Sequence, residues 1–344
     1  MPVLVTMSCS GAASPGRANA RVSGMLAVTA TRIVPEDPLA GLEVGDRPEP
    51  TAPHGWATVT VKATALNHHD LWTLRGVGIS EGQLPMVLGC DAAGVDEEGN
   101  EVVVHAVIAD PSVGDETLDP GRSLLSEKYD GTFAERVCVP RRNLVPKPAS
   151  LSFAEAACLP TAWLTAYRML FTRCALQPGQ IVLIQGAGGG VASAAIALGR
   201  AAGFVVWATS RDEGKRQRAL AAGAHAVFPT GARLPSRVDA VLETVGEATW
   251  DHSIKSLRPG GTVVVSGATS GFNPPALLNR VFFLQLTVTG STMGTRRELE
   301  QLLSFLDATG IRPTIDAVLP LDRARDGLAK MAEGDLFGKI VFTV

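Results

Sequence analysis

The sequence lacks the features that mark several classes of protein. Lys and Arg total 31 against 34 Asp and Glu, so the net charge of −3 gives no electrostatic footprint for nucleic acid. Aromatic residues make up only 5% of the chain, too few to suggest a base-stacking surface. No apolar run reaches the roughly 18 residues that a membrane-spanning helix needs. We therefore expect neither a nucleic-acid nor a membrane partner.

Cysteine is also scarce. The five cysteines are dispersed and form no Cys-x-x-Cys pair, which argues against a disulfide framework or a zinc ribbon and favours a reducing, cytoplasmic setting. The first 24 residues are small and polar, and they lack the basic start and long apolar core of a secretory signal. We interpret residues 1–24 as a disordered extension, or as sequence ahead of a start at Met25.

The 344 residues correspond to roughly two domains of the usual ~100–200 residues. From residue 25 to about 145, short segments that alternate apolar and polar residues predict strands at 57–65, 102–107 and 133–139. From about residue 150, helical and strand patterns alternate, which predicts a doubly wound parallel sheet in an α/β fold. Expected helices are 152–157, 163–171, 191–202, 213–222 and 296–309, and expected strands are 181–185, 204–208, 226–228, 238–243, 262–267, 286–289 and 339–344.

The strongest motif is a glycine-rich turn between an apolar strand and an Ala-rich helix. The segment runs from Ile181 to Ala192 and reads IVLIQGAGGGVA. Glycines let the backbone approach a pyrophosphate, and the helix N-terminus favours its negative charge. Because the turn follows a strand and opens a helix, we expect it to bind a dinucleotide. The candidate cofactor-binding residues of the turn are Gly186, Gly189, Gly190 and Val191.

The end of the next strand bears on the choice of cofactor. An NAD site usually carries an acid about 20 residues after the turn, but Thr209, Ser210 and Arg211 stand there, with Lys215 one helical turn further on. Hydroxyl and guanidinium groups suit a 2′-phosphate, so NADPH is the expected cofactor. Asp212 and Glu213 are contrary observations, although acids also favour a helix start.

The whole pattern resembles the medium-chain dehydrogenase/reductase superfamily, in particular its zinc-less, quinone-oxidoreductase-like branch. The resemblance implies a Rossmann dinucleotide-binding domain at 150–289 and a GroES-like catalytic domain formed by 25–149 and 290–344, with the active site between them. The matching segments are ALNHHDLW (65–72), LGCDAAG (88–94), DGTFAE (130–135), LTAYR (164–168), the glycine-rich turn, LRPGGT (257–262) and FGKIV (337–341).

Zinc decides the chemistry of such a protein. By resemblance, the ligand positions of a zinc alcohol dehydrogenase fall at Asn67, Cys90 and about Thr161, of which only Cys90 is a good ligand. The cysteine-rich structural zinc lobe is also missing between Val107 and Gly131. We therefore expect no metal. A site with shifted ligands, drawn from His68, His69, Cys90 and Asp91, remains the alternative.

Without a Lewis acid, the protein suits substrates that accept hydride readily, so a quinone or conjugated carbonyl (enone) is the expected small-molecule substrate. Asn67 and His69 are the candidate catalytic residues, as a hydrogen-bond donor and a proton donor. Trp72 and Cys90 are expected in the substrate pocket. The resemblance implies that Thr165, Val245, Gly267 and Ala268 border the nicotinamide and its ribose.

Several alternatives remain open from the sequence. The chain could be a double-bond reductase acting on an acyl thioester or within a biosynthetic pathway, a zinc alcohol dehydrogenase with shifted ligands, or a non-catalytic NADPH-binding sensor. Residues 286–292 resemble the family's edge strand that pairs across a homodimer, and an edge strand without such cover would be a pairing liability. A homodimer is therefore expected.

Overall fold

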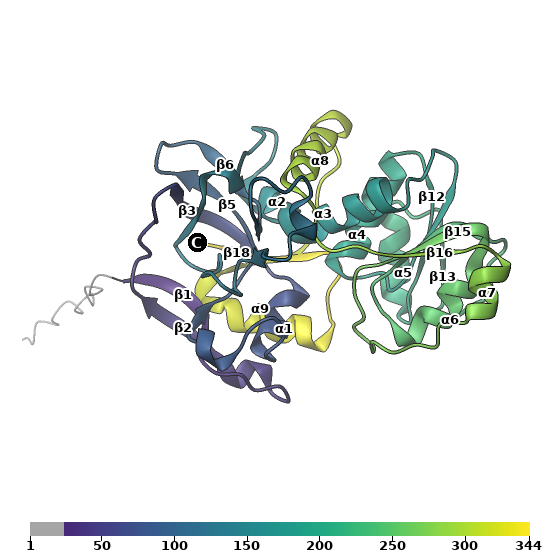
Figure 1. Ribbon diagram of the computed structural model, residues 1–344, viewed down its shortest axis with the longest axis horizontal. Coiled ribbons are helices and arrows are strands. Elements are labelled where there is room, and N and C mark those ends of the chain that lie inside the picture. Colours follow the sequence, from purple (N-terminus) through teal and green to yellow (C-terminus); the bar gives the residue numbers. More distant parts are fainter. Residues whose placement is uncertain (1–23) are drawn as a thin grey trace, which may run out of the picture.

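The computed structural model describes residues 24–344, so all but the last residue of the predicted extension lies outside the described residues. Two domains lie side by side along the long axis, with the chain crossing between them twice (Figure 1). The first contains residues from both ends of the described chain, and the second is built from its middle.

The first domain is organised around a mixed sheet in the order β10-β6-β5-β3-β18-β17, with β9 paired to β3. Its C-terminal strand β18 pairs antiparallel with β3 and parallel with β17, which returns the end of the chain to the middle of this sheet. The strands are β3 (Trp56–Ala65), β5 (Asp91–Asp96), β6 (Glu101–Val104), β9 (Arg136–Pro140), β10 (Leu144–Pro146), β17 (Ile315–Pro320) and β18 (Lys339–Thr343).

Smaller elements complete this domain. A second sheet has the order β2-β1-β4, and β7 pairs with β8. Their bounds are β1 (Met25–Ala30), β2 (Leu42–Arg47), β4 (Met86–Val87), β7 (Val107–Ile108) and β8 (Ser123–Leu124). The helices are α1 (His68–Leu74) and α9 (Ala324–Glu333), with 3-10 turns at Pro38–Gly41, Glu81–Gln83, Glu116–Leu118, Arg141–Asn143 and Leu321–Arg323.

The second domain contains a six-stranded sheet in the order β13-β12-β11-β14-β15-β16, in which every neighbouring pair is parallel. Its strands are β11 (Ile181–Ile184), β12 (Val205–Thr209), β13 (Ala226–Phe228), β14 (Val238–Glu243), β15 (Leu257–Val265) and β16 (Thr287–Gly290), and its helices are α4 (Gly190–Ala201), α5 (Glu213–Ala221), α6 (Glu247–Ser256) and α7 (Leu278–Phe283). The predicted α/β class with a Rossmann domain and a GroES-like domain is confirmed. Strand order reverses between β11 and β14, where open α/β sheets bind ligands.

Helices at the domain junction share one hydrophobic core with both sheets. Trp163 and Leu164 are buried there together with Val182 of β11 and Val341 of β18. The helices are α2 (Phe153–Ala157), α3 (Leu164–Tyr167) and α8 (Arg296–Thr309), with wider π turns at Leu159–Trp163 and Arg168–Arg173. A shared core of this kind couples the positions of the two domains.

Several predicted elements differ from the structure. The strand expected over 133–139 begins only at Arg136, and the strand expected over 262–267 begins earlier, at Leu257, and ends at Val265. The helix expected over 163–171 is regular only over α3 and passes into π turns on both sides; Pro160 in the first of them has no amide hydrogen for a regular helical bond. The strand expected over 102–107 ends at Val104, because His105 and Val107 turn their carbonyl oxygens to the side chain of Asn143 at 2.8 and 2.7 Å.

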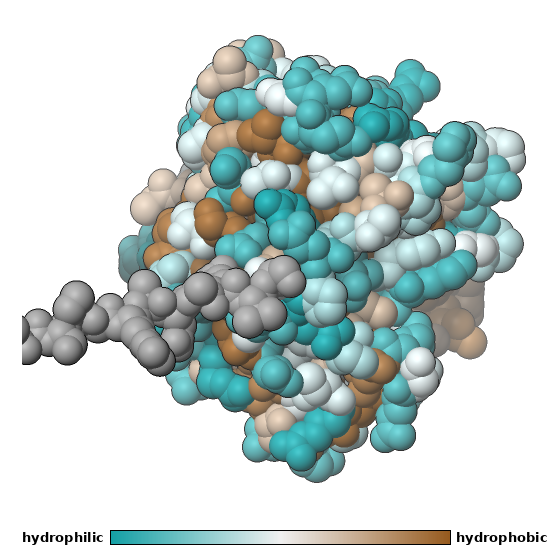
Figure 2. All heavy atoms as spheres, turned by 90° about the vertical axis from the view of Figure 1, so that its left-hand side faces the viewer, coloured by the Kyte–Doolittle hydropathy of each residue, from teal (hydrophilic) through white to brown (hydrophobic). Residues whose placement is uncertain are grey.

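The two ends of the molecule differ in surface character. The face of the first domain that points away from the second mixes hydrophilic and hydrophobic residues (Figure 2). At the other end, α7 exposes Leu278, Phe282 and Phe283 by 69 to 80%. None of the helices in residues 24–344 is long and apolar enough to cross a membrane.

Candidate active site

The glycine-rich turn lies between the end of β11 and the start of α4. Gly186 and Gly188 adopt φ of +73° and +138°, a region that side chains with a Cβ rarely occupy. A Cβ on Gly186 would stand 2.6 Å from the Val245 methyl, whereas a Cβ on Gly189 would meet nothing within 4 Å. Gly189 precedes a helix of 12 residues, whose free N–H groups and dipole suit a phosphate. The turn therefore fits the pyrophosphate of a dinucleotide.

A buried polar network supports this turn from below. The Thr209 hydroxyl donates to Gln185 Oε1 at 2.6 Å, and Gln185 Nε2 donates to Ser253 Oγ at 3.0 Å. Ser253 in turn donates to Glu243, whose other oxygen accepts from the backbone amides of Val245 and Gly246 at 2.8 and 3.0 Å. Thr209 thus faces the protein interior rather than a ribose. Sequence reasoning missed Gln185 and Glu243, although polar residues ending apolar strands were visible.

The residues expected to select the cofactor lie at the end of β12 and the start of α5. Asp212 caps α5, because its carboxylate accepts from the Lys215 amide at 2.7 Å. Ser210 is buried, and its hydroxyl accepts from the Asp212 amide at 3.2 Å. Arg211 is exposed, and Lys215 Nζ reaches the Gly334 carbonyl at 2.5 Å. One oxygen of the Asp212 carboxylate is thus engaged by the helix, and Arg211 is exposed to solvent.

The residues expected beside the nicotinamide gather at the ends of β14 and β15. A Cβ on Gly246 would lie 3.1 Å from the Ala268 side chain, and a Cβ on Gly267 would lie 3.0 Å from the Thr244 carbonyl. Val245 already packs against Gly186 of the turn. The fourth residue expected there, Thr165, belongs to a different element, α3, and is buried.

Across the junction, Asn67 caps the short helix α1. Its side-chain amide donates to the Ala65 carbonyl at 3.2 Å and to Asp91 Oδ2 at 2.9 Å. The side-chain oxygen of Asn67, Oδ1, accepts from Lys339 Nζ at 2.6 Å. Both amide hydrogens are therefore engaged within the protein, and Asn67 has no free donor for a substrate in this state.

Asp70 of α1 connects the start of this helix to Gly89. Its two carboxylate oxygens accept from the backbone amides of Asn67 at 2.8 Å and Gly89 at 3.2 Å, as a structural acceptor. Burial raises the pKa of Asp70 to about 6, against the opposing effect of His69 and the amide of Asn67.

His69 connects two other groups that sequence reasoning did not bring together. Its Nδ1 lies 3.3 Å from Cys90 Sγ, and its Nε2 lies 3.0 Å from a Glu127 carboxylate oxygen. Burial disfavours a charged imidazole, but contacts with Cys90, Glu127 and Asp70 outweigh it and hold the pKa of His69 well above its ordinary value. Burial raises the pKa of the Cys90 thiol, so the contact with the Glu127 carboxylate is the one that favours a proton on His69 near neutral pH. Glu127 gave no sequence signal because it lies 58 residues away.

Trp72 makes an aromatic contact between the two domains. Its ring lies 6.3 Å from that of Phe272, which follows β15 and is 72% exposed. The guanidinium of Arg75 stands 5.2 Å over the same indole. Trp72 thus contacts a residue of the second domain, whereas Cys90 is completely buried and lies against His69.

Two of the three positions that the resemblance assigns to zinc ligands, Asn67 and Thr161, do not suit zinc, whereas the third is Cys90. The side chain of Asn67 already bonds to Ala65, Asp91 and Lys339. The buried Thr161 hydroxyl has no hydrogen-bond partner among the described residues, but a hydroxyl is a poor zinc ligand. One other group, His69, Asp70 and Cys90, brings three potential ligand atoms within 4.8 Å of one another. Its members are already engaged: Cys90 Sγ is 3.2 Å from the Leu125 carbonyl, and both oxygens of Asp70 accept backbone amides.

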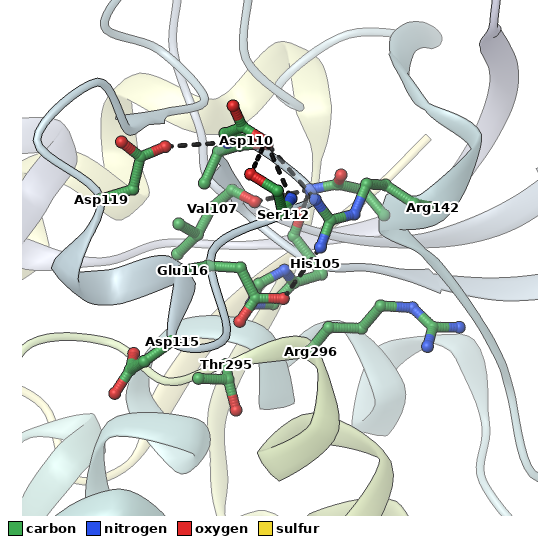
Figure 3. Close-up of polar contacts among 12 residues, drawn as sticks. His105, Val107, Asp110, Ser112, Asp115, Glu116, Asp119, Arg142, Thr295 and Arg296 are labelled. Atoms are coloured by element: carbon green, nitrogen blue, oxygen red, sulfur yellow. Dashed lines mark hydrogen bonds and ion pairs between the residues drawn. The ribbon is translucent and has the colours of Figure 1, made fainter.

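The loop in place of a cysteine-rich zinc lobe is held by ion pairs. Glu116 pairs with Arg142 at 3.2 Å, and Asp115 pairs with the buried Arg168 at 2.6 Å. The same guanidinium pairs with Glu298 of α8 at 2.6 Å. Figure 3 shows Glu116 directed toward Arg142, with further acids capping the loop nearby. The loop is thus connected to Arg142 and, through Arg168, to α8.

Comparisons with known proteins agree with this architecture. Residues 53–149 match the family model for the alcohol dehydrogenase GroES-like domain, and residues 190–308 match that for zinc-binding dehydrogenase. An acryloyl-coenzyme A reductase from Sulfurisphaera tokodaii is 26% identical, covering 90% of this chain and 98% of the relative. An alcohol dehydrogenase from Geobacillus stearothermophilus is 29% identical, covering 88% of this chain and 96% of the relative.

Solved structures include an NAD-dependent alcohol dehydrogenase with 34% identity and a TM-score of 0.86. The match covers 93% of this chain and 100% of that one. The two family models occur in the order of the two domains, and neither the models nor the relatives single out a zinc-less quinone-oxidoreductase branch. The chain belongs to the medium-chain dehydrogenase/reductase superfamily and is an oxidoreductase of that kind.

Proposed function

We propose that the protein is an NADPH-dependent reductase that transfers hydride to a quinone or a conjugated carbonyl compound. Two observations carry this proposal: the glycine-rich turn leaves open space at Gly189, and His69, on α1 of the other domain, contacts both Cys90 and Glu127. When bound, NADPH supplies the hydride. The chain's own residues position the cofactor and handle the proton.

Reduction of a conjugated carbonyl leaves an enolate, and reduction of a quinone leaves a phenolate, each of which needs a proton. His69 holds one between the Cys90 sulfur and the Glu127 carboxylate. Because both ring nitrogens are engaged, proton release requires one of these contacts to open. Glu127 is partly exposed and would return a proton from solvent to His69.

The preference for NADPH rests on charge at the end of β12. Arg211 is exposed there, and Lys215 and Arg216 lie on the first turns of α5. Asp212, the acid that could hold a ribose hydroxyl, caps the helix instead. A 2′-phosphate would meet the guanidinium of Arg211, whereas NADH would gain nothing from it.

A second candidate substrate is an enoyl thioester, because the relatives include two acryloyl-coenzyme A reductases. The hydride acceptor is again a carbon–carbon double bond conjugated with a carbonyl. The position of Trp72 and Arg75 at the junction is compatible with either substrate.

A substrate panel tests both candidates. Consumption of NADPH is followed with a quinone, 2-cyclohexenone, crotonyl-CoA and a simple ketone, and each reaction is corrected for its rate without protein. The proposal expects turnover of the quinone or the enone and little with the ketone. Turnover of crotonyl-CoA alone would select the thioester, whereas turnover of the ketone and its alcohol alone would contradict both candidates.

We further propose that two copies pair through β16, the edge strand of the second domain. Among the described strands, β16 pairs with β15 alone, and Val288 on it is 46% exposed. The preceding helix α7 exposes Phe282 and Phe283 by 72 and 80%, an apolar surface that pairing would cover. Light scattering of the wild-type protein should give twice the mass of one chain. The Val288→Lys variant should have the mass of a single chain.

A further inference from the structure

Phe272 is an exposed aromatic residue on a loop that is tied down on both sides of it. The residue is 72% exposed and lies between β15 and α7. Before it, the Ser270 hydroxyl donates to the Val245 carbonyl at 2.7 Å. After it, the Asn273 amide donates to Glu247 Oε1 at 2.8 Å. The loop is therefore held in place while the phenyl ring that it carries is left largely unpacked.

The loop lies directly against the end of β14. A Cβ on Gly246 would collide with the Gly271 carbonyl oxygen, and a Cβ on Gly271 would collide with the Glu247 carboxylate. Both glycines also have a positive φ, +93° and +138°, which residues with a Cβ rarely adopt. Phe272 is therefore carried at the same end of the sheet as Val245, which is expected beside the nicotinamide.

Trp72 contacts Phe272 from the other domain. Trp72 lies on α1 one helical turn after His69, so the two side chains are neighbours on the surface of that helix. The indole is 6.3 Å from the phenyl ring, with an angle of 53° between the ring planes, and the Arg75 guanidinium lies over the indole. The aromatic pair thus connects the helix of the proposed proton donor with the cofactor side of the junction.

The contact with Trp72 leaves most of Phe272 uncovered. A large apolar ring that is held in the open beside a reaction site is suited to cover part of a ligand. We propose that Phe272 is a specificity-determining residue whose ring packs against an aromatic ring of the acceptor. The acceptor is then a fused-ring quinone or an aryl-conjugated enone rather than a small aliphatic enone. The inference rests on the proposed reductase function and narrows its substrate class.

Two enones that differ in one group test the proposal. Benzalacetone carries a phenyl group where ethylideneacetone carries a methyl group. With NADPH saturating, kcat/KM is measured for both enones with the wild type, Phe272→Ala, Phe272→Tyr and a control, Val318→Ala, whose residue is 52% exposed on β17. Phe272→Ala should lose about tenfold with benzalacetone, chiefly through KM, and less than about twofold with ethylideneacetone. Phe272→Tyr keeps the ring and should keep the preference, and Val318→Ala should change neither value.

The ratio of the two kcat/KM values decides the outcome. A Phe272→Ala variant with the wild-type ratio would overturn the inference, and an equal loss with both enones would assign Phe272 to the contact between the domains. Such a result leaves the reductase function intact, because the wild type still reduces both compounds. A wild type that reduces neither enone and no quinone would instead contradict the proposed function, and the inference with it. Because Phe272 is exposed, its truncation leaves no cavity, and thermal unfolding should show an unchanged midpoint.

Discussion

The side of the junction that would bind the nucleotide and the opposite, catalytic side are built differently. The surface of the first is mainly backbone, a glycine-rich turn and a helix N-terminus, and a buried side-chain network lies beneath it. The second consists of side chains, in which Lys339, Asp91, Asn67, His69 and Cys90 hold one another. Added side-chain volume should therefore damage the first, whereas removal of a charge should damage the second.

The largest effect is expected from Lys339→Met, which leaves Asp91 as an unpaired buried carboxylate. Breaking a buried pair on one side typically costs about 3–5 kcal/mol in the free energy of unfolding. Lys339→Met/Asp91→Asn should recover much of this loss, because no charge is left unpaired. Denaturant unfolding of the three proteins measures it. If the single and double variants were equally stable, the unpaired charge of Asp91 would not be the cause of the lost stability.

His69→Gln should lower kcat for the preferred acceptor by about 100-fold, the smaller end of what general acid catalysis contributes. Because the pKa of His69 is held well above its ordinary value, wild-type kcat should be steady near neutral pH and fall as alkaline pH removes the proton. A pH profile with NADPH saturating checks this. Glu127→Gln should shift the fall to lower pH, and an unchanged profile in both variants would exclude His69 as the proton donor.

Gly186→Ala tests the backbone side. The new Cβ at φ +73° would meet the Val245 methyl at 2.6 Å, so we expect a loss of about 2 kcal/mol in stability without cofactor. Gly189→Ala is the matched control, since it has φ −72° and no atom within 4 Å of the new Cβ. Thermal unfolding without ligand compares the two. Similar losses would mean that the turn is not strained as described.

The smallest effect is expected at the end of β12. Arg211→Ala should reduce the preference for NADPH over NADH in kcat/KM about tenfold, or about 1.4 kcal/mol, because one charge-assisted contact with the 2′-phosphate is lost. Arg233→Ala, an exposed arginine after β13, is the control and should change neither value. A loss shared equally by both cofactors would show that Arg211 does not read the 2′-phosphate.

The same contrast explains what could be predicted from sequence. The fold class, the glycine-rich turn and helices such as α8 follow from local periodicity and glycine placement, and the structure agrees with them. The partners of the catalytic side are far apart in sequence: Lys339 is 272 residues from Asn67, and Glu127 is 58 from His69. No local pattern encodes such contacts, so Asn67 was expected to face a substrate although Lys339 and Asp91 occupy its amide.

The central claim is that this superfamily member reduces its substrate with NADPH and without a metal. The most direct test dialyses the protein against a strong chelator, measures its metal content, and then follows NADPH oxidation with the best quinone or enone of the panel. The account predicts an unchanged rate in protein that holds far less than one metal per chain. A rate that disappears with the chelator and returns with one equivalent of zinc would contradict it.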